Sequence, residues 1–249
     1  MEKKIYEIGE MEEGIFLERP NRFVCKVKLA NDEEVLVHVH DSGRIKELLY
    51  TGNIVKIKKA KNLEKRKTEW DLISAKAEDG EDILLNSIFH RYISENILND
   101  AEISPFGKID FLKAEVKKGH SRLDYFIEKN NKKIWLEVKG ASLVKNKEAI
   151  FPDAPSIRAS KHLDTLVDII EEGENASVMF LVFRNCNFFS PNWETDKIFS
   201  EKFYRAMDKG VKIFLIQLKL KNGNIYYVNK KINIKQLGKG TYDYDKTQN

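Results

Sequence analysis

Two short runs in the middle of the chain carry the side chains best suited to chemistry. The first contains Asp124, the second contains Glu137 and Lys139, and the turn Asn130-Asn131 separates them. Both runs alternate and are rich in β-forming residues, so the spacing predicts a β-hairpin. Side chains alternate in direction along a strand, which places Glu137 and Lys139 on one face. Two carboxylates on neighbouring strands with a lysine beside them can hold a divalent cation and a water nucleophile, as in metal-dependent nucleases.

A simpler arrangement fits the same three residues. Opposite charges on adjacent strands form cross-strand ion pairs on a solvated sheet face. Glu-x-Lys is common in a chain that is 33% charged, and it recurs at Glu115 and Lys117. Asp110 precedes that second copy too closely to come from an adjacent antiparallel strand, so we expect Glu115 to lie outside any site. Asp124, Glu137 and Lys139 therefore fit either a metal site or an ion pair.

Length and composition limit the classes of protein to which the chain can belong. The chain has 249 residues, enough for one large domain or two ordinary ones, and 42% of them are apolar, enough for a real core. Cys25 and Cys186 are the only cysteines, so we expect two buried hydrophobes and no disulfide framework or cysteine-based zinc site. Residues 1–13 are charged throughout, and no apolar run reaches membrane-spanning length. These features predict a soluble, cytoplasmic protein with no membrane partner.

The net charge is only +4, but positive charge is concentrated in one segment of the chain. Between residues 56 and 67 a single acidic residue, Glu64, accompanies seven basic ones: Lys56, Lys58, Lys59, Lys61, Lys65, Arg66 and Lys67. The run alternates with apolar residues, as on a strand and the loop after it. It fits a solvated strand face and it fits a surface that contacts nucleic-acid phosphates.

The first third of the chain reads as short strands, at residues 14–17, 23–29, 34–40, 54–58 and 69–75, with a brief helical segment at 43–50. Five short strands interrupted by one helix suit a small closed barrel of the oligonucleotide-binding type. Such barrels bind single strands through basic grooves and aromatic platforms, for which Arg22 and Phe23 are candidates. The polar stretch 78–82 is the best domain boundary, giving domains at 1–82 and 83–249.

The second domain alternates helices and strands. Helices are expected at 86–98, 155–170 and 194–207, and strands at 111–116, 122–127, 134–138, 178–183, 213–218 and 225–228. The order helix, three strands, helix, strand is the layout of the restriction-endonuclease-like core, an α/β domain with a mixed sheet, so the chain as a whole is α+β with two domains. Glu95 shares a helical stripe with Ile88 and Tyr92, and a carboxylate on an apolar stripe is costly unless a cation lies nearby.

Several motifs together strongly resemble the sugar fermentation stimulation protein family. They are Ser121-Arg122-Leu123-Asp124-Tyr125, Glu137-Val138-Lys139, Phe151-Pro152-Asp153-Ala154, Arg158 and Lys161-His162-Leu163, with Asn21-Arg22-Phe23, Lys65-Arg66-Lys67, Trp70-Asp71-Leu72 and Asn86 also fitting. The resemblance implies an oligonucleotide-binding barrel followed by a restriction-endonuclease-like domain of the PD-(D/E)xK type. It also implies DNA binding with little sequence preference and a regulatory link to sugar metabolism, especially maltose. The chain departs from the family at residues 39–44, where relatives carry Cys-Pro-Asn-Thr-Gly-Ser.

Two functional classes follow. In the first, a deoxyribonuclease, Asp124, Glu137 and the Val138 carbonyl hold Mg²⁺ or Mn²⁺ with Glu95 as a fourth ligand, and Lys139 orients the water. The second is a DNA-binding regulator of sugar genes that does not cleave. Both predict DNA as the partner, and both are compatible with a homodimer. The residues expected to contact DNA are Arg22, Lys56, Lys58, Lys65, Arg66, Lys67, Arg122, Arg158, Lys161 and His162.

Overall fold

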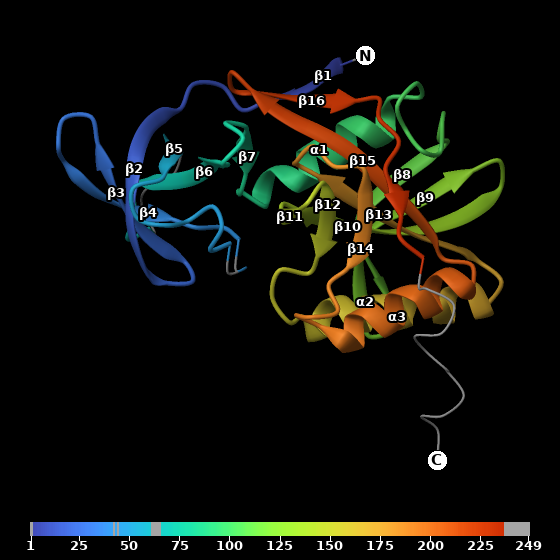
Figure 1. Ribbon diagram of the computed structural model, residues 1–249. Helices are drawn as coiled ribbons and strands as arrows, with labels where there is room; N and C mark the ends of the chain where they lie inside the picture. The colour runs from blue at the N-terminus through green and yellow to red at the C-terminus, as the bar shows by residue number, and fades with distance from the viewer. Residues whose placement is uncertain (1, 42, 44, 61–65, 237–249) are drawn as a thin grey trace.

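The computed structural model describes residues 2–41, 43, 45–60 and 66–236, and it has two domains side by side (Figure 1). The first domain contains β2 (Glu12–Asn21), β3 (Val24–Leu29), β4 (Glu34–His38), β5 (Ile54–Lys59) and β6 (Trp70–Lys76). The second contains α1 (Ile88–Asn99), α2 (Ile157–Glu171), α3 (Lys197–Asp208) and the strands β8 (Phe111–Lys118), β9 (Ser121–Lys129), β10 (Lys132–Ala141), β13 (Asn175–Val182), β15 (Lys212–Lys221) and β16 (Asn224–Val228).

The first domain is a closed barrel of five strands, as the sequence predicts. Neighbouring strands pair antiparallel in the order β4-β3-β2-β5-β6, and β4 then pairs parallel with β6, which closes the barrel. Alternation along the strands turns one set of apolar side chains inward, and Cys25, Val27, Val37 and Val55 are fully buried. Closure leaves no free strand edge within the ring.

The second domain is a mixed sheet with helices on both faces. β8, β9 and β10 pair antiparallel, while β10, β13 and β15 pair parallel. Alternate residues of β10 enter different cores: Leu136 packs with α1 residues, and Trp135 packs with residues of α2 and α3. Consequently α1 covers one face and the α2–α3 pair covers the other, as Figure 1 shows. Side chains with the parity of Trp135, including Glu137, face α2.

Two short strands join the domains, and neither was predicted. β7 (Asp82–Leu84) pairs with β6 of the barrel and with β15 of the second domain, so one hydrogen-bonded sheet continues through the predicted boundary. β1 (Glu2–Glu7) pairs antiparallel with β16, at the top of Figure 1. Charged residues dominate β1, and β7 is only three residues long, which hides both patterns. A hydrophobic cluster also extends from the barrel to α1.

Two local predictions were wrong. Residues 46–48 form a turn rather than a helix, because Ile45 has a positive φ of 47°, which ends regular helical geometry. On α1 the buried side chains include Ile93 and Ile97, whereas Ile88 and Tyr92 are 48% and 45% exposed. The stripe that carries Glu95 therefore lies at the surface, where a carboxylate needs no cation.

A second small sheet supports the segment that follows β10. It contains β11 (Val144–Lys145), β12 (Glu148–Phe151), β14 (Phe188–Pro191) and β17 (Asn233–Ile234). Cys25 and Cys186 are both buried and free, as expected for small hydrophobes. Of the helices in the described ranges, none combines the length and the apolar character that crossing a membrane requires.

We predict that Phe203→Ala lowers the free energy of unfolding by about 3–5 kcal/mol, because it empties the centre of the α2–α3 core. Phe203 is fully buried, with its ring centroid 5.7 Å from that of Phe189 and 6.1 Å from that of Phe180. Phe111→Ala is the control, because Phe111 is 47% exposed, and it should cost less than about 1 kcal/mol. Urea unfolding followed by circular dichroism measures both, and equal losses would contradict the assigned core.

Candidate functional site

A cleft opens where the β9–β10 hairpin separates. Backbone pairing between the two strands ends at Tyr125 and Leu136. Just beyond, the Val138 amide donates instead to Oδ2 of Asp124, at 2.7 Å. The cleft has a volume of about 460 Å³, and we call it the carboxylate cleft. Its lining comes from α1, β8, β9, β10, the end of β12 and the start of α2: Ser87, Ile88, His90, Arg91, Ser94, Ala114, Glu115, Asp124, Tyr125, Glu137, Val138, Lys139, Phe151, Ser156, Arg158 and Ala159.

Glu137 is the most buried charge in the carboxylate cleft, with 2% of its surface exposed. Its Oε1 accepts hydrogen bonds from Nζ of Lys139 and from Nδ1 of His162. Burial acts to raise the pKa of Glu137, but the His162 hydrogen bond and the Lys139 charge outweigh it, so the pKa is lowered and the carboxylate is ionised. Oε2 of Glu137 is buried and has no hydrogen-bond partner among the described residues.

Asp124 lies on the same sheet face as Glu137. Burial, and after it the nearby Glu137 charge, raises the pKa of Asp124 to about 6, against the hydrogen bond from Val138. Within the described residues, Oδ1 of Asp124 has no hydrogen-bond partner, while Oδ2 is bound to the Val138 amide. Two partly desolvated carboxylates that repel each other, each with an oxygen unbound, are an arrangement that a divalent cation stabilises.

The amino-terminal end of α2 forms one wall of the cleft. Oγ of Ser156 accepts from the Ala159 amide at 3.1 Å and so caps the helix. Arg158 in the first turn is exposed and lines the cleft. His162 lies one turn further and contacts Glu137. The positive end of the helix dipole and the Arg158 guanidinium together favour an anion beside the carboxylates.

His90 of α1 is one of the cleft residues that the sequence analysis did not assign to a site. It stacks on Phe183 with centroids 5.3 Å apart, and it lies so close to Gly140 that any side chain at 140 would collide with it. Burial lowers the pKa of His90 to about 4, so its imidazole is neutral at pH 7. A glycine directly after Glu-x-Lys is the one sequence signal for this close approach.

Glu115 also lines the carboxylate cleft, contrary to the expectation that it lies outside any site. The β8–β9 pairing continues on both sides of Glu115 and Asp124 but omits these two residues. Glu115 has a φ of 57°, an unfavourable value for a residue with a side chain, and its carboxylate is 3.2 Å from Nε of Arg122. The irregularity in β8 therefore lies beside Asp124.

The structure brings Asp124, Glu137, Val138 and Lys139 together but does not bring Glu95 to them. Oε1 of Glu95 accepts from Nε of Arg91 at 2.9 Å on the surface of α1, and Glu95 does not line the cleft. Among the described residues no group of three or more His, Cys, Asp or Glu side chains is placed to hold a metal ion. The donors that lie together are thus the carboxylates of Asp124 and Glu137, with backbone oxygens beside them.

The predicted DNA contacts divide into exposed and internally bound residues. Lys56 pairs with Asp82 at 2.6 Å, Lys58 donates to the Ile8 carbonyl, and Arg66 pairs with Asp71. His162 is buried against Glu137 rather than exposed to phosphates. Lys65 lies outside the described residues. The exposed side chains are those of Arg22, Lys67, Arg122, Arg158 and Lys161.

The raised pKa of Asp124 predicts a pH-dependent effect of Asp124→Asn. The folded pKa of about 6 exceeds the unfolded value of about 3.9, so the free energy of unfolding falls as the pH rises through this window. The asparagine, which keeps an acceptor for Val138, should be more stable than wild type at pH 8 by on the order of 2 kcal/mol and equal to it at pH 4. Urea unfolding in EDTA tests this, with Glu128→Gln, an exposed residue near the far end of β9, as control. Equal stabilities at pH 8 would refute the desolvation of Asp124.

Comparisons with known proteins cover most of the chain. Residues 17–85 match the SfsA N-terminal OB domain, and residues 84–224 match the sugar fermentation stimulation protein RE domain. A sugar fermentation stimulation protein homolog from Thermosipho melanesiensis is 45% identical over 90% of this chain and 94% of its own length. One from Methanothermobacter thermautotrophicus is 40% identical, covering 80% and 82%. The structure of Pyrococcus furiosus SfsA in complex with Ca²⁺ matches 94% of this chain and all of its own, with a TM-score of 0.84 and 26% identity. The chain therefore belongs to the sugar fermentation stimulation protein family.

Proposed function

We propose that the carboxylate cleft is the metal site of a DNA nuclease. The observation that carries the proposal is the Glu137 carboxylate, which is ionised and buried and has an unpartnered Oε2 on the sheet face that it shares with Asp124. An unpartnered ionised oxygen in the interior is costly unless a cation compensates it. An ion pair on a solvated sheet face would expose this oxygen to water, whereas Glu137 is only 2% exposed.

The donor set suits Mg²⁺ or Mn²⁺. We assign Oδ1 of Asp124, Oε2 of Glu137 and the carbonyl oxygen of Val138 as ligands, with waters completing the shell. Hard oxygen donors of this kind also accept Ca²⁺, the ion with which Pyrococcus furiosus SfsA forms its complex. When bound, such an ion acidifies a water and neutralises charge on a phosphate.

The chain's own residues supply the remaining parts. Lys139 lines the cleft with its ammonium group on Glu137, which places it to orient a water and to stabilise negative charge as it develops on the phosphate. His162 fixes the Glu137 carboxylate from α2. Arg158 and the α2 amino terminus attract a flanking phosphate, and Lys161 and Arg122 extend the exposed positive surface. These contacts are to the backbone of DNA and carry no sequence preference.

A second candidate is a DNA-binding regulator of sugar genes, including those of maltose metabolism, that does not cleave. No group of three acidic or histidine side chains is placed to hold a metal within the described ranges, and Oε1 of Glu137 is already bound by Lys139 and His162. A site with few donors fits weak metal binding without turnover. The same exposed cations then serve affinity alone.

Metal binding is predicted to depend on Glu137. Calorimetric titration with Mn²⁺ should give one site per chain, and Glu137→Gln should weaken it at least about tenfold, because the neutral amide lacks the charge that the cation compensates. Glu128→Gln, which removes an equal charge from an exposed residue of β9 that does not line the cleft, should leave the affinity unchanged. Unaltered binding by Glu137→Gln would place the ion elsewhere.

Cleavage is predicted to depend on Lys139. Labelled DNA, assayed as single strands and as duplexes, should be cut in at least one of these forms with Mg²⁺ or Mn²⁺ and should remain intact with EDTA. Lys139→Ala should slow cleavage by about 100-fold or more while changing the Kd for DNA little, because one phosphate contact among many contributes little to affinity. Lys133→Ala, at an exposed position of the same strand, is the control. Wild-type protein that leaves every substrate intact would favour the regulator.

A further inference from the structure

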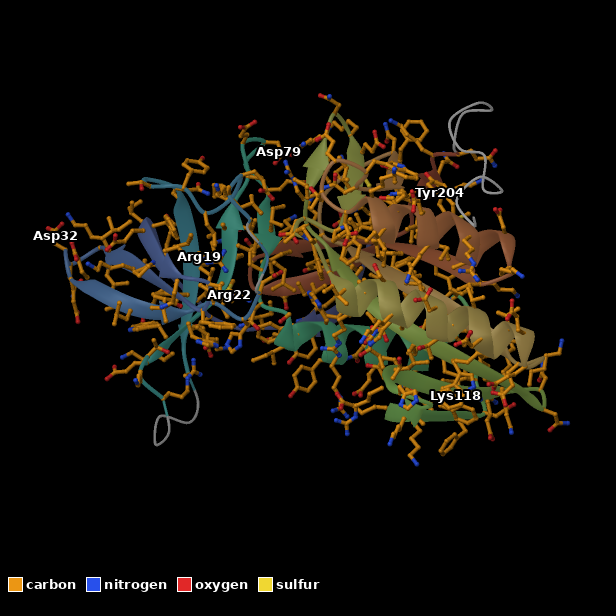
Figure 2. The ribbon with its side chains drawn as sticks, turned by 90° about the horizontal axis from the view of Figure 1, so that it is seen from below. Arg19, Arg22, Asp32, Asp79, Lys118 and Tyr204 are labelled. Carbon is orange, nitrogen blue, oxygen red and sulfur yellow. The ribbon has the colours of Figure 1, made fainter. Side chains whose placement is uncertain are left out.

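A second cleft lies between the domains and continues into the carboxylate cleft. This interdomain cleft has a volume of about 610 Å³. The barrel contributes Arg19, Arg22 and Lys46 to its lining, and the second domain contributes residues 151–156. Phe151 and Ser156 line both clefts, so the two spaces meet at the start of α2. Figure 2 shows Arg19 and Arg22 on the part of the barrel nearer the second domain, with Asp32 at the opposite end.

Arg19 holds the barrel wall in shape. Its guanidinium donates to the backbone carbonyls of Arg22, Asp41 and Gly43, at 2.6, 2.8 and 2.8 Å. The carboxylates of the lining lie close to the same backbone: Oδ1 of Asp41 accepts from the Gly43 amide, and the Asp153 carboxylate packs directly against Gly43. These groups fix the contact between the domains.

Arg22 and Lys46 differ from Arg19 because both are exposed. Neither forms an ion pair with another residue in the described parts of the chain, so their charges are available to a ligand. The Arg22 guanidinium is 5.8 Å from the ring centroid of Phe23, and that ring is 51% exposed. A cation beside an exposed aromatic ring is the pairing that binds a phosphate and its neighbouring base in single strands.

We propose that the interdomain cleft binds single-stranded DNA and leads it to the carboxylate cleft, so that the substrate is DNA with an unpaired segment. This inference rests on the proposed function for the identity of the ligand. Arg22 and Lys46 contact phosphates, Phe23 stacks on a base, and the strand passes Phe151 and Ser156 to reach the second domain's cleft. Base stacking requires an unpaired base, which a blunt duplex does not offer to Phe23.

The test measures binding without cleavage. Fluorescence anisotropy in EDTA compares a labelled oligothymidylate of about 20 nucleotides with a blunt duplex of the same length, using the full chain. The double variant Arg22→Gln/Lys46→Gln should bind the single strand at least about tenfold more weakly. The slope of log Kobs against log salt should fall by about 1.4, because each lost phosphate contact is worth about 0.7 for single strands. Affinity for the duplex should change less than about twofold.

Two further variants complete the experiment. Phe23→Ala should weaken single-strand binding at least about fivefold through lost stacking. Lys28→Gln removes one positive charge from the barrel where Lys28 pairs with the exposed Asp32, and it should change neither ligand's affinity. Circular dichroism confirms that each variant is folded.

The outcomes separate this inference from the proposed function. Unchanged single-strand binding by the double variant, or equal losses for single strand and duplex, would overturn the strand path even where wild-type protein cleaves DNA. Selective loss of single-strand binding supports the path even where no cleavage is found, which would refute the nuclease alone.

Discussion

A single buried charge, the Glu137 carboxylate, determines how α2 packs on the sheet of the second domain. The Glu137 carboxylate is almost completely removed from water, and an ionised group in that position requires compensation from nearby donors. One donor, Lys139, comes from the same strand, and the other, His162, comes from α2. The contact therefore fixes α2 across the sheet and sets the position of its positive amino-terminal end. Loss of either donor would leave the Glu137 charge less compensated. A change to the carboxylate cleft therefore also changes the packing of α2 on the sheet.

Interrupted backbone pairing creates the space for the site. β9 loses its regular partner on one side where the hairpin with β10 ends, and on the other side where Glu115 and Asp124 leave the ladder with β8. Asp124 is the residue at both interruptions. Its carboxylate accepts a hydrogen bond from the Val138 amide in place of a backbone carbonyl of a neighbouring strand. The backbone donor at the point of separation is therefore still paired. The strands therefore separate while the Val138 amide keeps a hydrogen-bond acceptor.

The barrel, the mixed sheet and the Asp124–Glu137–Lys139 arrangement could be predicted because period-two alternation fixes which side chains share a face. Contacts between distant segments could not. Nothing in the local pattern of α2 shows that His162 turns inward to Glu137. Helix periodicity is visible in a sequence and pointed to Glu95. Glu115 was set aside because Asp110 precedes it too closely, and the irregularity that brings Glu115 beside Asp124 is not visible in a sequence. Strand β1 was missed because its partner β16 lies far away in the chain, and β7 because three residues are too few to show a pattern.

The pairing of β1 with β16 has a consequence for the order of folding. During synthesis the segments of the barrel emerge early and can close on one another while β1 still lacks its partner. Residues 224–228 are made only after the barrel and after α1, α2 and α3. Closing so long a loop is slow, so this edge is a late event in assembly. Until then β1 presents unsatisfied backbone groups, the kind that recruit other chains. β1 can therefore pair only in a nascent polypeptide whose second domain has been translated through β16.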